Sequence, residues 1–136
     1  MKTKHSYLIL VMFFALQFSQ AQITFVKHKN NKTYNIPKWE VIDVAIKAKT
    51  KIKNPFVTDF GATFTHENGS TQKVPGFYNG NNEWVIRFSN AIQGKWKFVT
   101  YGEDKKLKNK KGTINVGKPK ANKHGSIVIE KDSKKF

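Results

Sequence analysis

A one-by-one alternation of apolar and polar residues constrains the fold of this chain more than any other feature of its sequence. It is clearest at residues 39–48, where four apolar side chains fall on one side: Ile42, Val44, Ile46 and Ala48. Asp43 and Lys47 fall on the other side. A period of two is that of a β-strand, whose successive side chains point to opposite faces of its sheet. We therefore expect a strand with one buried face and with Asp43 on the solvent side, either hydrated or paired with a lysine.

The same alternation recurs along the chain between turn-forming residues. Further strands are expected at residues 60–65, 72–74, 83–88, 94–101, 112–116 and 126–129. Asn68-Gly69 accepts the positive φ of a tight hairpin, and Pro75-Gly76 is expected to interrupt the strand before it. Beyond residue 22 no segment has the period of a helix. These patterns indicate an all-β fold, an immunoglobulin-like antiparallel β-sandwich of about seven strands, with a small closed barrel as the alternative.

The tryptophans support the sandwich. Trp39, Trp84 and Trp96 fall in strand-forming stretches, and the last two have apolar neighbours two residues away that place them in the core. Gly94, Trp96 and Phe98 are spaced like the corner before the sixth strand of an immunoglobulin-like fold, where the aromatic residue is commonly tyrosine. With tryptophan there, the usual hydrogen bond from the aromatic side chain to the backbone has to come from the indole N–H or be absent.

The first 21 residues have the layout of a secretory signal peptide. Lys2 and Lys4 precede an apolar run at residues 7–16, and the small residues Ser19 and Ala21 follow it. The run is shorter than the roughly 20 residues that a helix needs to span a bilayer. We therefore predict cleavage after Ala21 and export to the periplasm or the cell exterior, with no membrane attachment once the signal is removed.

The charge of the chain is strongly one-sided, with 25 basic and 9 acidic residues and a net charge of +16. Signal cleavage would leave a net charge of +14. Only Arg87 among the basic residues is an arginine, and specific recognition of phosphates and bases favours the planar, bidentate guanidinium group. The lysines, together with the many asparagines, also fit a genome rich in A and T. A solvated lysine surface is therefore favoured over nucleic-acid binding.

No pattern of reactive residues points to catalysis. The chain has no cysteine, so disulfides and thiolate zinc sites are excluded, and its four histidines are scattered. Its acidic residues lie mostly at strand ends, solvent faces and turns, with no pair placed for glycoside hydrolysis. Nucleophile-elbow and phosphate-loop motifs are absent as well. We expect no catalytic residue, no cofactor and no metal ion.

The segment at residues 75–80 places aromatic residues next to asparagine at a turn. Loop aromatics of this kind stack on sugar rings or dock a neighbouring domain. The candidate residues for docking or glycan contact are Phe77, Tyr78, Asn79 and His124. Docking to a domain is favoured over sugar binding at this turn.

A linked series of short motifs gives the chain a family resemblance. The motifs are Trp39-Glu-Val-Ile-Asp-Val44, Asn54-Pro-Phe56, Phe64-Thr-His66, Val74-Pro-Gly-Phe-Tyr-Asn-Gly80, Trp84-Val-Ile-Arg-Phe88, Gly94-Lys-Trp96 and Asn122-Lys-His-Gly125. In this order they resemble the immunoglobulin-like domain of unknown function at the front of apiosidase-like glycoside hydrolases. The chain departs from that family at Gln93, where an acidic residue is expected, and in its lysine-rich hairpin at residues 105–111. The end of its signal is similar to those of exported proteins of Bacteroidota.

The resemblance implies a domain organisation and a partner. Residues 22–33 become a polar lead-in with at most a short edge strand, residues 34–130 the sandwich, and residues 131–136 the start of a linker to a catalytic (β/α)₈ barrel. The chain ends at Phe136, so the resemblance implies that coding sequence for such a barrel lies beyond it.

Two hypotheses for function remain open. The first is a non-catalytic accessory module that docks onto a hydrolase barrel. The second is a free-standing module that binds a carbohydrate or polyanion, such as an acidic polysaccharide, through Tyr78 and the lysine surface. A docking module should expose an apolar patch on one face, whereas a binding module should show aromatic residues and lysines along a groove.

Overall fold

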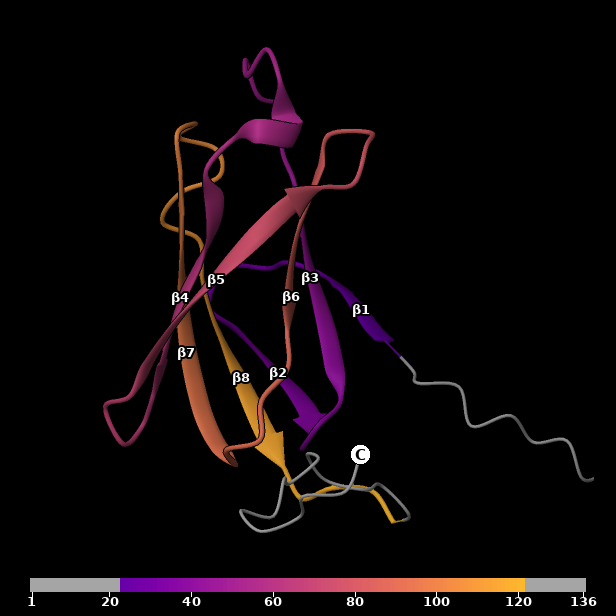
Figure 1. Cartoon of the computed structure of the whole chain (residues 1–136), viewed down its shortest axis with the longest axis vertical. Coiled ribbons are helices and arrows are strands. Elements are labelled where there is room, and N and C mark those ends of the chain that lie inside the picture. The colour runs from indigo at the N-terminus through magenta and orange to yellow at the C-terminus, as the bar shows by residue number, and fades with distance from the viewer. Residues whose placement is uncertain (1–22, 122–136) are drawn as a thin grey trace, which may run out of the picture.

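The computed structural model describes residues 23–121, which contain eight β-strands and one 3₁₀ helix (Figure 1). In chain order the elements are β1 (Ile23–Lys27), β2 (Lys32–Pro37), β3 (Val41–Lys47), the 3₁₀ helix η1 (Pro55–Val57), β4 (Phe60–His66), β5 (Thr71–Tyr78), β6 (Glu83–Phe88), β7 (Gly94–Gly102) and β8 (Lys111–Gly117). The all-β class predicted from the alternation is confirmed. The strand expected at residues 126–129 lies outside the described residues.

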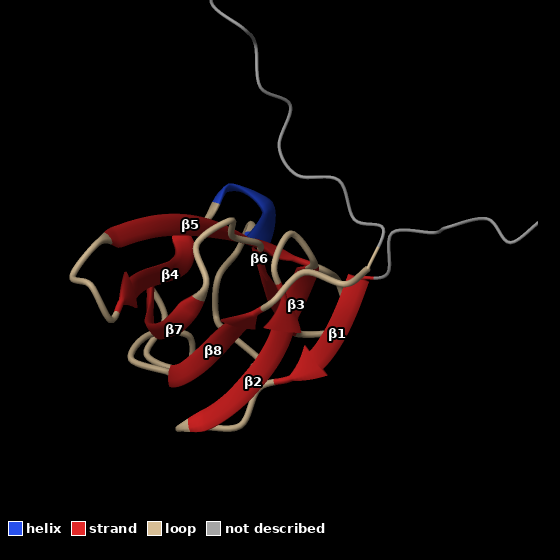
Figure 2. Cartoon of the chain, turned by 90° about the horizontal axis from the view of Figure 1, so that it is seen from below, coloured by secondary structure: helices blue, strands red, loops and turns tan. Residues whose placement is uncertain are grey.

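The strands form two layers that share β5 (Figure 2). Sheet A has the order β1-β3-β6-β5, and sheet B has the order β5-β4-β7-β8-β2. The outermost strands of this order, β1 and β2, are not hydrogen-bonded to each other, so the alternative of a closed barrel is wrong. The predicted β-sandwich is confirmed.

The edge strands differ from the purely antiparallel arrangement that was expected. β1 pairs with β3 in parallel, and β2 pairs with β8 in parallel. These two strands follow each other in the sequence, joined by residues 28–31, yet each extends a different sheet. The expected polar lead-in at residues 22–33 therefore contains all of β1 and the start of β2. Alternation of residue types reveals which side of a strand is buried but not the direction of its neighbour.

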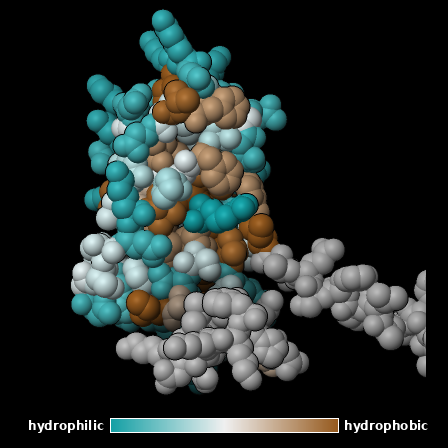
Figure 3. Space-filling model, viewed as in Figure 1, coloured by the Kyte–Doolittle hydropathy of each residue, from teal (hydrophilic) through white to brown (hydrophobic). Residues whose placement is uncertain are grey.

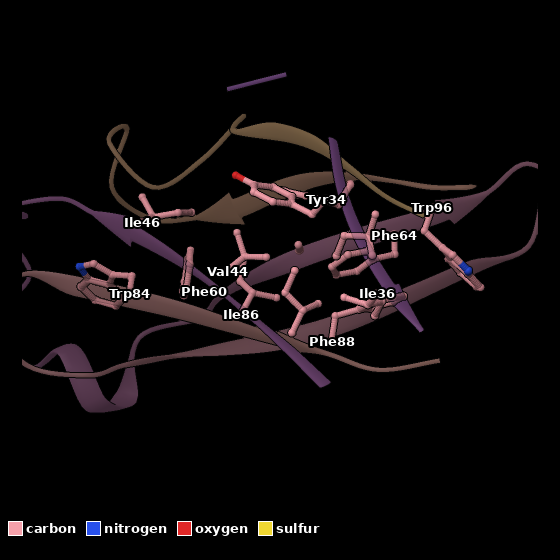
Figure 4. Packing of buried hydrophobic residues seen from close by; sticks show 14 of the residues in the cluster. Tyr34, Ile36, Val44, Ile46, Phe60, Phe64, Trp84, Ile86, Phe88 and Trp96 are labelled. Atoms are coloured by element: carbon pink, nitrogen blue, oxygen red, sulfur yellow. The ribbon is translucent and has the colours of Figure 1, made fainter. Parts of the chain in front are cut away.

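Aromatic side chains from the two sheets meet in the core (Figure 4). Phe64 of sheet B stacks on Phe88 of sheet A with ring centroids 4.1 Å apart, and Phe60 meets Trp84 edge to face at 5.4 Å. Each such pair contributes about 0.5–1.5 kcal/mol beyond the burial of its area. The face predicted for β3 is confirmed, because Ile42, Val44, Ile46 and Ala48 are all buried in this core. Without any disulfide, this burial supplies the main stabilisation of the fold.

Strand β5 passes from one sheet to the other at Pro75 and Gly76. Residues 71–75 pair with β4, whereas residues 76–78 pair with β6. The expectation that Pro75-Gly76 would interrupt the strand is therefore wrong. Strand pairing continues through the crossing because β5 exchanges its neighbour there.

A side chain at position 76 would not fit into this crossing. A Cβ atom on Gly76 would overlap the Phe60 ring and lie 2.9 Å from the carbonyl oxygen of Val85. Glycine thus lets Phe60, which is 2% exposed, pack directly against the backbone of β5.

At the corner before β7, the structure decides between the two possibilities that the sequence left open for Trp96. The indole Nε1–H of Trp96 donates to the carbonyl oxygen of Ile92 at 3.2 Å. Gly94 has a φ of +121°, and a Cβ atom there would lie 2.5 Å from Nε2 of His66. That imidazole is buried, packs on Trp96 with ring centroids 4.7 Å apart, and is hydrogen-bonded through Nε2 to the carbonyl oxygen of Gln93 at 2.9 Å. The Trp96 indole and the His66 imidazole therefore both form hydrogen bonds with the backbone of this corner.

Trp39 departs from its expected place in a strand. It lies in the turn before β3 with a φ of +66°, a conformation that bulky residues adopt at a cost. Lys38 lies over its ring, with Nζ 4.5 Å from the ring centroid.

We predict that Gly76→Ala lowers the free energy of unfolding by about 1–3 kcal/mol, the usual cost of forcing a carbon atom into a packed core. Urea denaturation of the mature chain measures this. Gly117→Ala is the matched control, because the nearest atom to a Cβ there is 3.7 Å away and its φ is not positive. An equal loss in both variants would contradict a tight crossing.

Candidate functional site

The outer face of sheet A is unusually apolar for a surface. Register places outward side chains from four strands on this face: Ile23 and Phe25 of β1, Ala45 of β3, Val85 of β6 and Phe77 of β5. Ile23, Phe25 and Phe77 are 47%, 48% and 42% exposed, whereas Ala45 and Val85 are buried between them. We call these five residues the apolar face. Figure 3 shows apolar side chains gathered on this side of the molecule around a polar one.

An ion pair crosses the middle of the apolar face. Asp43 and Arg87 are directly opposite each other on β3 and β6, and the guanidinium donates through Nε and Nη2 to the two carboxylate oxygens, each at 2.8 Å. Asp43 is buried, at 6% exposed. The expectation of a hydrated or lysine-paired Asp43 is therefore wrong, because the partner is the single arginine of the chain. Asp43 does lie on the outer side of β3, but it is buried there and both of its carboxylate oxygens are bound by Arg87.

Arg87 of this ion pair interacts with both Asp43 and Phe77. Hydrogen bonds to Asp43, and then the charge of that carboxylate, raise the pKa of Arg87 further above its ordinary value. The guanidinium carbon also lies 5.8 Å from the ring centroid of Phe77, a distance at which a cation is attracted to the ring face. Arg87 therefore lies between Asp43, to which it is hydrogen-bonded, and the ring of Phe77.

A second exposed apolar group lies at the end of the sandwich. Phe56 and Val57 of η1 are both 78% exposed. The ring of Phe56 contacts Tyr78 edge to face, with centroids 5.6 Å apart. Asn54 caps this helix by accepting from the backbone N–H of Phe56 at 3.1 Å. The sequence did not identify Phe56 and Val57 as exposed contact residues, although Asn54-Pro-Phe56 belongs to the motifs that carry the family resemblance.

The residues proposed from the sequence as contacts have different surroundings. Phe77 is on the apolar face, but Tyr78 points inward and packs against Trp84, with ring centroids 5.0 Å apart. The Tyr78 hydroxyl accepts from the backbone N–H of Asn82 at 3.0 Å. Asn79 is exposed and donates to the Glu83 carboxylate at 2.8 Å. His124 lies outside the described residues.

The outer face of sheet B is polar and carries lysines. Exposed lysines at outward positions of its strands are Lys73, Lys95, Lys97 and Lys111. The two outer faces therefore differ in chemistry. Sheet A has an apolar centre, with exposed Lys27 and Lys47 at the ends of β1 and β3, whereas sheet B carries lysines and threonines across its strands.

The described residues offer no assembly for catalysis or metal binding. Within residues 23–121 no three His, Asp or Glu side chains are grouped to hold a metal ion. Two of the most buried carboxylates already have partners, since Asp43 binds Arg87 and Glu40 binds Lys120 at 2.8 Å. Among the same residues, no helix has the length and hydropathy needed to cross a membrane.

The fold and its surfaces thus define a small β-sandwich module of the immunoglobulin-like kind. The chain belongs to the family described as "Domain of unknown function (DUF5060)", which it matches over residues 35–103. This stretch runs from within β2 to just past the end of β7 and includes the crossing of β5.

A solved structure links the module to glycoside hydrolases. A candidate glycoside hydrolase from Bacteroides vulgatus is 31% identical to this chain, with a TM-score of 0.63 over 74% of the chain. The match spans only 19% of that protein. The family expected from the sequence motifs is in this respect confirmed: the module is related to part of a candidate glycoside hydrolase.

Two further solved structures are similar only at a low level. A cysteine protease inhibitor from Entamoeba histolytica has a TM-score of 0.45 at 8% identity, covering 70% of this chain and 95% of its own. The ZIG-8–RIG-5 heterodimer of IG1 domains has a TM-score of 0.40 at 11% identity, covering 67% and 88%. Neither similarity bears on function. Among curated proteins, no significant similarity is found.

We predict that Arg87→Gln destabilises the fold, because it leaves the buried Asp43 carboxylate without its charged partner. Arg87→Lys should recover only part of the loss, since an ammonium group cannot engage both oxygens in the same plane. The midpoint of urea denaturation measures the order of the three proteins. If Arg87→Lys matched the native chain, the bidentate geometry would not matter.

Proposed function

We propose that this chain is a non-catalytic accessory module of a secreted glycoside hydrolase that degrades polysaccharides. In this role the module docks onto a catalytic domain, a (β/α)₈ barrel of the apiosidase-like kind, and supports it mechanically. The observation that carries the proposal is the apolar face of sheet A.

The composition of that face suits burial against another protein domain. Three half-exposed apolar side chains surround fully buried ones, which leaves apolar area in water that a partner would cover. The Asp43–Arg87 pair is already satisfied within the module. Docking would therefore not bury an unpaired charge at the centre of the contact.

The similarity to the candidate glycoside hydrolase supports the identity of the partner. The match covers 19% of that protein, so about four fifths of its length lies outside the module. A domain of this kind therefore occurs there in one chain with much additional sequence. We infer that the partner of the module is the catalytic part of such an enzyme.

The proposal includes export of the protein from the cytoplasm through its amino-terminal signal peptide. The amino-terminal pattern of basic residues, a short apolar run and small residues predicts a cleaved signal peptide ending at Ala21. Outside the cell or in the periplasm, a cysteine-free sandwich does not depend on disulfide formation.

The mature chain by itself is expected to hydrolyse no glycoside, because its described carboxylates form no opposed pair across a cleft. A panel of pectic, hemicellulosic and glucan substrates, assayed for reducing ends, tests this. Turnover that disappeared in Glu83→Gln or Asp43→Asn would overturn the non-catalytic assignment.

The proposal predicts that a catalytic domain is encoded beside this chain, in the same reading frame or after an interruption, and docking is tested by co-expressing that domain with the mature chain. We expect a complex in size-exclusion chromatography, with slower hydrogen exchange at β1 and β6 in the complex. The variants Phe25→Ser and Phe77→Ser should weaken it by about tenfold each, since each loses roughly 1–2 kcal/mol of apolar burial.

Val99→Ser is the matched control, because Val99 is 41% exposed but lies on the opposite sheet. It should leave the complex unchanged. Absence of a catalytic-domain sequence at the locus, or exchange protection confined to β7 and β8, would contradict docking through the apolar face.

A further inference from the structure

The outward side chains of sheet B form a regular grid. One row across the sheet contains Lys73, Thr63, Val99 and Lys111, from β5, β4, β7 and β8 in turn. Neighbouring strands are about 4.8 Å apart, so the two lysines at the ends of this row are separated by roughly 14 Å. The next row contains Thr71, Thr65, Lys97 and Thr113. Lys95 follows Lys97 on the same side of β7.

This grid is cationic and has no acidic side chain at any of the strand positions named. None of Lys73, Lys95, Lys97 and Lys111 forms an ion pair with a described residue. The two ion pairs of the described chain involve Arg87 and Lys120, which lie elsewhere. Like charges held on one sheet face repel each other unless an anion lies among them. The four lysines therefore constitute a surface suited to a polyanion, which we call the lysine face.

The lysine face is hollowed on both sides of Lys97. One hollow of about 430 Å³ is lined by Thr65, His66, Glu67, Lys95 and Lys97. The other, of about 330 Å³, is lined by Asn31, Lys97, Phe98, Val99, Lys111, Gly112 and Thr113. Lys97 belongs to both, so the two hollows adjoin across β7. Together they offer a path for an extended chain, with threonine hydroxyl groups between the lysines and with Glu67 as the acidic residue in the lining of the first hollow.

We propose that the lysine face binds an acidic polysaccharide, one whose sugar units carry carboxylate or sulfate groups. Threonine hydroxyls beside the lysines can hydrogen-bond sugar hydroxyls, and lysine ammonium groups can donate hydrogen bonds to anionic groups in several directions. The site is separate from the docking contact, because it lies on the other sheet. It gives the module a second activity that does not depend on a catalytic partner.

The side chains of this face favour a polysaccharide over a nucleic acid. Single-stranded nucleic acids are bound by stacking bases on exposed aromatic rings, and specific contacts to duplexes favour arginine. The one aromatic ring at an outward strand position here, Tyr101, is covered by Lys73 with Nζ 4.3 Å from the ring centroid. Arg87 is on the opposite face and engaged with Asp43. The lysine face thus has the charge for a nucleic acid without the groups that recognise one.

Affinity electrophoresis of the mature chain in gels containing polygalacturonate, with a dextran gel as the uncharged reference, tests the proposal. We expect retardation by polygalacturonate alone, weakening as salt rises. The double variant Lys97→Gln/Lys111→Gln should raise the dissociation constant by about tenfold, the effect of losing two exposed charge contacts of roughly 0.7 kcal/mol each.

The matched control is Lys27→Gln/Lys53→Gln, which removes the same charge from exposed positions outside sheet B. It should bind like the native chain, and so should the docking variant Phe77→Ser. An equal loss in both double variants would mean that net charge alone attracts the polymer. Tighter binding of single-stranded or duplex DNA than of polygalacturonate would overturn the choice of ligand. If the native chain bound polygalacturonate but formed no complex with the catalytic domain, the proposed accessory function would be contradicted and the glycan-binding site would stand.

Discussion

The contact between the Phe60 ring and the bare backbone at Gly76 is the constraint on which the two-sheet structure depends. It is made where β5 leaves β4 and joins β6, so it sets how closely the two layers approach at their shared strand. The edge-to-face contact of Phe60 with Trp84 then continues into the aromatic core. A chain without cysteine has no covalent substitute for this packing. Burial of a few large rings therefore determines both the stability of the sandwich and the separation of its outer faces.

The centres of those outer faces differ in chemistry, and the difference follows from what each sheet can satisfy internally. Sheet A buries Asp43 on its outside by pairing it with Arg87, so apolar neighbours can surround the pair without leaving a charge unpaired. Sheet B gathers lysines with no acidic partner among its strands, which is stable only in water or against anions. A protein partner on one side and an acidic glycan on the other would leave each surface with its preferred surroundings. The module would then hold a polymer near an enzyme without taking part in bond cleavage.

The alternation of residue types predicted the buried faces well, because side-chain parity depends only on the strand itself. It located Ile42, Val44, Ile46 and Ala48 in the core. It could not identify the partner of Asp43 or the parallel pairing of β1 with β3 and of β2 with β8. It also could not show that β5 continues through Pro75-Gly76. Each of these features depends on which strand lies alongside. Parity within residues 71–78 would have turned Tyr78 inward once the strand was known to continue. Phe56 and Phe25 could not be recognised as exposed, because nothing local distinguishes an uncovered ring from a buried one.

Strand β5 carries one residue of each surface at the same parity, with Lys73 on the lysine face and Phe77 on the apolar face. The three residues between them include the crossing, so both side chains point outward from different sheets. Insertion or deletion of a single residue in this strand would turn one of the two inward while the other kept its place. Loops at either end can vary in length, but the length of this strand cannot. Relatives that retain both surfaces should therefore show substitutions in β5 and no gaps.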